Sequence, residues 1–147
     1  MPARPIFHPS DFSPASGPAF RKAMALAKGM RRPLLIVHVM SPVTLVTGDA
    51  YIAPNVWPML EQSIELVARR GVTRLVKRAR AAGVRTSSLL LRGVTHEAIV
   101  RAARRHRAEM IVIGTHGRTG VKGMLLGSVA SRVVSHAACP VMTVHGR

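Results

Sequence analysis

A glycine-rich segment that follows an apolar run is the part of this sequence best suited to hold a ligand. Within residues 114–128, glycines stand at positions 114, 117, 120, 123 and 127, and Ser128 follows. Glycine has no Cβ, so its backbone can approach a ligand closely, and the free amides at a helix start attract anions. Arg118 and Lys122 add positive charge. The segment therefore predicts a phosphate-binding loop, although a long loop with Ser128 as a helix cap would use the same residues.

Two common phosphate signatures do not fit this loop. A Walker loop requires Gly-Lys followed by Ser or Thr, a triplet that the sequence lacks, and a dinucleotide fingerprint requires GxGxxG. Gly114 and Gly117 are separated by two residues rather than one. The pattern present is instead G-x2-G-x9-G-S, which starts at Gly114 and ends with Gly127 and Ser128.

The apolar pattern of the chain predicts strands and helices in alternation. Aliphatic runs indicate strands over 4–8, 33–40, 84–91, 110–114 and 140–145, and helical spacing indicates helices within 13–29 and over 56–82, 95–107 and 129–137. This order favours an α/β fold in which helices cover both faces of a parallel sheet. We expect one domain over residues 1–147, with an aliphatic core because only three Phe, one Tyr and one Trp occur.

Finer features of the helices are also predicted. Ser13 or Ser16 would cap the first helix, and Thr95 would cap the third. Gly71 would bend or interrupt the long second helix. The expected inner face of that helix consists of Leu60, Ile64, Val67, Val72, Leu75 and Val76.

Two segments are expected to meet at the ligand site. In parallel α/β sheets, ligands bind beyond the carboxyl ends of the strands, where the strand order reverses. The segment HPSDFS at 8–13 follows the first strand, and the glycine-rich loop follows the fourth. Residues 41–55 show Pro, Gly and Asp breaks and no clear period, which indicates a long connection that could act as a flap.

On the G-x2-G-x9-G-S spacing, the sequence resembles the ATP-binding branch of the universal stress protein family (UspA-like). HPSDFSPAS at 8–16, LLIVHV at 34–39 and HAACPVMTV at 136–144 resemble other parts of the family pattern, so the resemblance spans essentially the whole chain. It implies a Rossmann-like, five-stranded parallel sheet of order 3-2-1-4-5. It also implies a regulatory or protective role in the stress response.

The resemblance implies a set of ATP contacts. Pro9 and Asp11 would reach the adenine or ribose, although Asp11 could instead cap the first helix. Val39 would contact adenine. The remaining contacts would be Ile113 and Gly114 at the ribose, and Gly117, Gly127, Ser128 and Val129 at the phosphates.

Catalysis has less support in the sequence than binding. Asp11 is the one acid in the expected site, joined by Asp49 if residues 41–55 fold over it, and neither forms a carboxylate pair or a metal box. Mg²⁺ could arrive with the nucleotide rather than on protein ligands. We expect ATP binding with slow hydrolysis at most, and assign no catalytic residue.

Composition bounds the remaining possibilities. The net charge is +16, from 22 Lys and Arg against six Asp and Glu, which attracts anions in general. Basic stripes at Arg69, Arg70, Arg74, Lys77 and Arg78, and at Arg101, Arg104, Arg105 and Arg107, leave nucleic-acid binding open as a weaker alternative. No run is long and apolar enough to cross a membrane, no secretory signal is evident, and Cys139 is alone, so we expect a cytoplasmic protein.

The terminal strand and the histidines complete the predictions. The strand over 140–145 is expected at a sheet edge, where it would pair with a second copy in a homodimer. His8 and His38 are expected to be packed, and His116 could donate to a phosphate. His96 and Glu97 begin an HExxH zinc motif, but residue 100 is valine.

Overall fold

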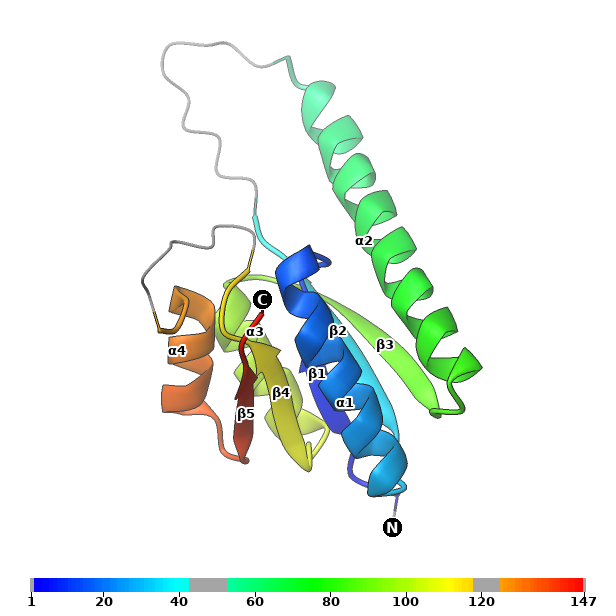
Figure 1. Cartoon of the computed structure of the whole chain (residues 1–147). Helices are drawn as coiled ribbons and strands as arrows, with labels where there is room; N and C mark the ends of the chain where they lie inside the picture. The colour runs from blue at the N-terminus through cyan, green and yellow to red at the C-terminus, as the bar shows by residue number, and fades with distance from the viewer. Residues whose placement is uncertain (1, 43–52, 118–124, 147) are drawn as a thin grey trace.

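Five parallel strands form one sheet in the computed structural model, which describes residues 2–42, 53–117 and 125–146. The strands are β1 (Ile6–Pro9), β2 (Leu34–Met40), β3 (Thr86–Arg92), β4 (Met110–Gly114) and β5 (Val141–Val144). Their order is β3-β2-β1-β4-β5, with β1 between β2 and β4 (Figure 1). The predicted fold class and strand order are confirmed; the boundaries of β4 are as expected, and those of the other strands differ from the expected ones by at most two residues.

Helices cover both faces of the sheet, as predicted. A short 3-10 turn, η1 (Pro14–Ser16), leads into α1 (Gly17–Gly29), which shares one core cluster with α2 (Val56–Ala81). The second cluster contains α3 (Thr95–Arg105) and α4 (Ser128–His136). Ile6 of β1 packs in the first cluster and its neighbour Phe7 in the second, because successive strand side chains point to opposite faces. The central strand therefore packs against the helices on both faces of the sheet.

The predicted break in the second helix is wrong, because α2 is continuous from Val56 to Ala81. Glycine in a helix interior costs only ~1 kcal/mol relative to alanine, which packing can offset. Gly71 is buried here beneath the ring of Phe12. The inner-face assignment of Val67 is also wrong: its side chain is 58% exposed, because Ala68 takes the inner position and adjacent helical residues point about 100° apart.

The predicted helix caps are wrong as well. Ser13 and Ser16 occupy the capping positions of η1 and α1, yet neither makes a side-chain cap hydrogen bond. Pro18 at the second position of α1 removes one amide that a Ser16 cap would bind, and the Ser16 hydroxyl instead donates to the Ser13 carbonyl oxygen over 2.7 Å. Thr95 is the first residue of α3 rather than its cap, and its hydroxyl lies 3.0 Å from the Ser41 hydroxyl.

Some predictions lie outside the described residues: those for Arg118, Lys122, Asp49 and two loop glycines, Gly120 and Gly123, and most of the proposed flap over 41–55. Within the described part of the chain, none of the helices has the length and hydropathy needed to span a membrane.

Candidate functional site

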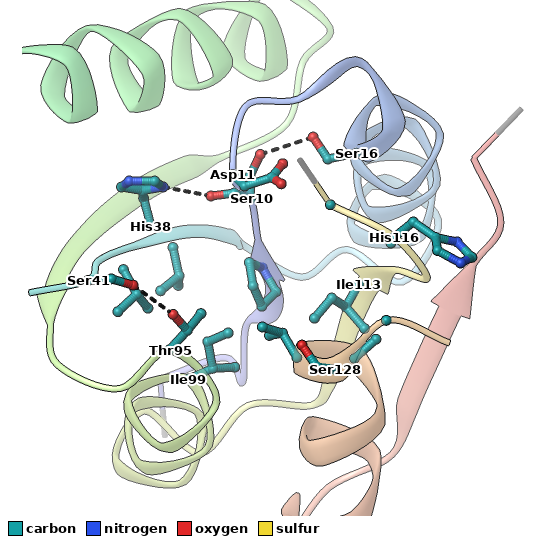
Figure 2. Close-up of a pocket in the computed structure, with 18 of the residues that line it drawn as sticks. Ser10, Asp11, Ser16, His38, Ser41, Thr95, Ile99, Ile113, His116 and Ser128 are labelled. Carbon is teal, nitrogen blue, oxygen red and sulfur yellow. Dashed lines mark hydrogen bonds between the residues drawn. The ribbon is translucent and has the colours of Figure 1, made fainter. Parts of the chain in front are cut away.

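A pocket of about 540 Å³ opens at the carboxyl ends of β1, β2 and β4. Every residue predicted for the ATP site lines it: Pro9, Asp11, Val39, Ile113, Gly114, Gly117, Gly127, Ser128 and Val129. Figure 2 shows Asp11 in the turn after β1 and Ser128 across the pocket at the start of α4. The volume is typical of small-molecule sites. The structure thus brings together residues separated by more than a hundred positions in the chain.

The turn after β1 is held by side-chain hydrogen bonds. The Phe12 amide donates to Ser10 Oγ over 3.1 Å, and the Ser13 amide donates to Asp11 Oδ1 over 2.9 Å. His38 Nδ1 on β2 lies 2.8 Å from the carbonyl oxygen of Ser10, so the ring donates and ties the turn to the neighbouring strand. Asp11 therefore closes a local turn of the kind that Asp and Asn side chains favour.

The glycines after β4 leave room that side chains would fill. A Cβ built on Gly117 would lie 2.6 Å from Asp11 Oδ2, and one built on Gly127 would lie 3.0 Å from the Thr115 carbonyl oxygen. The Gly127 amide donates to that same carbonyl over 2.6 Å. Gly127 is the capping residue of α4, so the first backbone amides of that helix lie at the pocket, where they have no partners within the helix. This side of the pocket can receive an anion.

The opposite end of the pocket is largely apolar. Val39 and Met40 of β2, Ile64 of α2 and Ile99 of α3 form its walls. Sequence reasoning did not assign the last two residues to the site. Ile64 was predicted to lie on the inner face of the second helix, and Ile99 lies in the helix that follows β3. An isoleucine in a pocket wall cannot be told from a core isoleucine by its residue type.

The Ser41 and Thr95 hydroxyls meet at the rim of the same end, and neither was predicted there. Thr95 begins α3, three residues after the carboxyl end of β3, and that position was the available signal. The pocket thus combines apolar walls with a polar border.

His8 lies buried in β1 and is packed as predicted. Its Nδ1 donates to the Val112 carbonyl oxygen over 2.9 Å, and its ring lies 5.7 Å from that of Phe20. Burial lowers the pKa of His8 from 6.5 to about 4, against smaller opposing effects of the Val112 hydrogen bond and the Asp11 charge. The imidazole is therefore neutral at pH 7, and His8 is not among the residues that line the pocket.

Two further histidines gather beside the glycine side. Thr115 Oγ1 lies 3.0 Å from His116 Nδ1 and 3.2 Å from His145 Nδ1, and the two rings meet edge to face. Of these two histidines, His116 lines the pocket and His145 does not. Its predicted donation to a phosphate stays a prediction.

Cys139 is half-buried, and burial raises the pKa of its thiol, which disfavours the reactive thiolate. Across residues 2–42, 53–117 and 125–146, no group of three His, Cys, Asp or Glu side chains could hold a metal ion.

The sequence model of the Universal stress protein family matches residues 2–145, and the chain belongs to this family. A universal stress protein of Methanocaldococcus jannaschii, MJ0531, is 32% identical over 139 residues, which cover 95% of this chain and 80% of that protein.

Solved structures agree in fold. The structure of MJ0577, another Methanocaldococcus jannaschii protein, superposes with a TM-score of 0.84 at 23% identity and covers 100% of this chain and 99% of its own. A universal stress protein of Archaeoglobus fulgidus, solved in complex with dAMP, gives a TM-score of 0.71 at 25% identity and covers 97% of this chain and 98% of its own.

Proposed function

We propose that the protein binds ATP in this pocket and that nucleotide occupancy serves a regulatory or protective role in the stress response. The observation that carries the proposal is the contrast between the two ends of the pocket, apolar walls at one and a glycine cradle with a helix start at the other. ATP has the same two ends, a flat base and a polyanion. The Archaeoglobus fulgidus relative, which binds dAMP, supports an adenine nucleotide as the ligand class.

In this proposal each side of the pocket has its own task. Val39 and the apolar walls receive adenine, and Asp11 with Pro9 contacts the ribose or base. Ile113 and Gly114 line the ribose side. Gly117, Gly127, Ser128 and Val129 hold the phosphates through backbone amides and the Ser128 hydroxyl, which adds a donor at the positive end of α4.

Hydrolysis is expected to be slow at most. It requires a positioned water, usually a base, and neutralisation of charge at the γ-phosphate. Among the described lining residues Asp11 is the only acid, and its Oδ1 already accepts the Ser13 amide. We expect Mg²⁺ to enter with the nucleotide, because it is commonly held by substrate phosphates and water.

Isothermal titration of nucleotide-stripped protein with ATP, at low and high salt, tests the proposal. The Gly127→Val variant places a branched side chain against the Thr115 carbonyl, whereas a Cβ on Gly29 meets nothing within 4 Å. We expect stoichiometric binding by the wild type and by the Gly29→Val control, and none by Gly127→Val. The proposal is overturned if the stripped wild type binds no ATP. It is also overturned if Gly127→Val still binds ATP and high salt abolishes that binding.

We also propose a homodimer through β5, which is an edge strand of the sheet. The carbonyls of Pro140 and Val144 accept amides from the β4 side, so by alternation the Thr143 amide points to the open edge. Thr143→Pro removes that outward donor and spares the β4 ladder. Sedimentation should show a dimer for the wild type and for Thr143→Val, and a monomer for Thr143→Pro. A monomeric wild type would refute the dimer.

A second candidate function is sequence-independent binding of nucleic acid along α2. A shallow groove of about 520 Å³ runs along this helix and is lined by Arg69, Arg70, Thr73, Arg74, Lys77 and Arg78. Glu65 pairs with Arg69 at 2.7 Å and with Arg92 at 3.1 Å, and no ion pair is found for the other basic residues of the groove within the described part of the chain.

Duplex binding separates this candidate from the nucleotide site. Duplex affinity through the groove should weaken steeply as salt rises. It should also be lower in an Arg70→Gln/Arg74→Gln double variant and unchanged in Gly127→Val. Equal duplex binding by the wild type and the double variant would remove the groove as a candidate.

A further inference from the structure

Phe12 has an unusual backbone conformation within the turn after β1. Its φ is +64°, in the left-handed region that large side chains rarely adopt. The other non-glycine residues with positive φ in the described chain, Arg31 and Arg107, follow the ends of α1 and α3, where this conformation is common. Phe12 ends no helix. Its conformation is therefore maintained by contacts elsewhere.

Those contacts hold the Phe12 ring from two sides. The ring stacks on His38, with centroids 4.4 Å apart and planes 24° from parallel. On α2 it lies against Gly71, so closely that a Cβ built there would be 2.5 Å from Phe12 Cε2 and 2.6 Å from Cζ. Gly71 is buried, and its missing side chain forms a notch for the ring. This notch explains a glycine in the middle of a continuous helix.

The same turn carries the carboxylate that faces the pocket. Asp11 precedes Phe12, and its Oδ1 accepts the amide of Ser13, which follows Phe12. The Phe12 amide itself donates to Ser10 Oγ. The two amides and the carboxylate are consequently linked through the backbone of Phe12, and we expect a displaced ring to shift the peptide that carries Asp11. Phe12 does not itself line the pocket.

We infer that the Phe12 ring, seated in the Gly71 notch of α2, is a positioning residue that fixes Asp11 for the nucleoside end of the bound nucleotide. The inference rests on the ATP-binding function proposed above. It predicts a selective effect: disturbing the notch weakens the contact made by Asp11 but leaves the start of α4, with Gly127 and Ser128, unchanged.

Gly71→Ala tests the inference with two readouts. In the ligand-free protein, the Phe12 and Ser13 amides should exchange with solvent at least about tenfold faster, because local opening exposes their hydrogen bonds. In titrations, ATP should bind about tenfold more weakly, as expected for loss of a hydrogen bond to a charged group. Inorganic tripolyphosphate, which has no nucleoside, should bind as it does to the wild type.

Control variants separate positioning from general destabilisation. Gly29→Ala makes the same chemical change in a helix where the added Cβ meets nothing within 4 Å. Val84→Ala removes buried volume from the same core cluster but lies in the loop before β3, away from the pocket. Neither should change the ratio of ATP to tripolyphosphate affinity. Phe12→Ala adds no clash, so it serves if Gly71→Ala fails to fold, and should show the same selective loss.

The double variant completes the design. If both residues act through one contact, Phe12→Ala/Gly71→Ala should lose no more ATP affinity than the weaker-binding single variant. Unchanged amide exchange and ATP affinity in Gly71→Ala would overturn the inference, as would equal weakening of ATP and tripolyphosphate. If the wild type binds no ATP, both the proposed function and the role of Asp11 in nucleotide binding are refuted. Amide exchange in Gly71→Ala would still show whether the Phe12 ring fixes the turn.

Discussion

The two sides of the pocket are built in opposite ways. The side that follows β1, residues 9–16, is fixed by side chains: a carboxylate, hydroxyls and an aromatic ring in a notch. The side that follows β4, described over 114–117 and 125–128, depends on glycines, whose lack of a side chain leaves room at the pocket. A surface of backbone amides suits any anion, whereas oriented side chains can discriminate between ligands. We therefore expect selectivity from the first side and phosphate affinity from the second.

The largest effect is expected where the two sides touch. A Cβ on Gly117 would lie 2.6 Å from Asp11 Oδ2, so Gly117→Val must displace either the carboxylate or the loop. We expect this variant to lose both ATP and tripolyphosphate binding in calorimetric titrations. Gly29→Val, with open space around its Cβ, should bind both ligands normally. Retention of tripolyphosphate binding by Gly117→Val would show that the sides are independent.

The next effect concerns His8, which is buried in β1 just before the first side begins. The pKa of His8 is about 4 in the folded protein and 6.5 when unperturbed, so the unfolded chain takes up a proton first as the pH falls. Stability is therefore fully present above pH 6.5 and is lost toward pH 4, by about 3 kcal/mol at roughly 1.4 kcal/mol per pKa unit. Urea unfolding of the wild type across this range measures the loss.

His8→Gln is the matched variant, because its amide can still donate toward Val112 but does not titrate. We expect a smaller loss of stability between pH 6.5 and 4 in this variant than in the wild type. Parallel curves for the two proteins would mean that other groups, such as carboxylates with lowered pKa values, dominate the acid sensitivity.

A change confined to the first side should alter selectivity. Asp11→Asn keeps the shape of the side chain but removes its charge, so ATP should bind about tenfold more weakly through loss of a charged hydrogen bond. Tripolyphosphate should bind equally well or more tightly, because a nearby negative charge is gone. Paired titrations with the two ligands measure the ratio, and a drop in both affinities would contradict the division between the sides.

The smallest effect is expected from a change confined to the second side. Ser128→Ala removes one neutral hydroxyl donor while the backbone amides of α4 remain. ATP and tripolyphosphate affinities should fall together by roughly two- to tenfold, the range for one hydrogen bond. Ser131→Ala, one turn further along α4, is the control and should bind both ligands as the wild type does. A loss limited to ATP would place Ser128 with the first side.

The sequence predicted the sheet and the site better than the contacts that support them. Alternating aliphatic runs predicted the parallel α/β fold, and the G-x2-G-x9-G-S spacing carried the family resemblance, which implied the strand order and a set of residues that share one pocket. These features are periodic or local, so sequence reasoning can detect them. The notch at Gly71 joins residues far apart in the chain, and a lone glycine in a helical pattern indicates a bend as readily as a packing site.

The helix caps failed for a related reason. Ser13, Ser16 and Thr95 have the residue types of caps, but Ser13 makes no side-chain cap bond and the Ser16 hydroxyl donates to the Ser13 carbonyl oxygen. The Thr95 hydroxyl pairs with Ser41, which comes from a different segment. Residue preference at a helix start is therefore overridden where another hydrogen-bond partner competes for the side chain.

The central place of β1 also has a consequence for how the chain is made. Its neighbour β2 follows within about thirty residues, but His8 bonds to Val112, 104 positions later. During synthesis β1 therefore keeps one edge uncovered until β4, more than a hundred residues later, has left the ribosome, a long-range pairing of the kind that slows folding. Both walls of the pocket come together only at that stage. A ligand of the pocket can thus stabilise the folded protein, but it finds no complete binding site on the nascent chain before that stage.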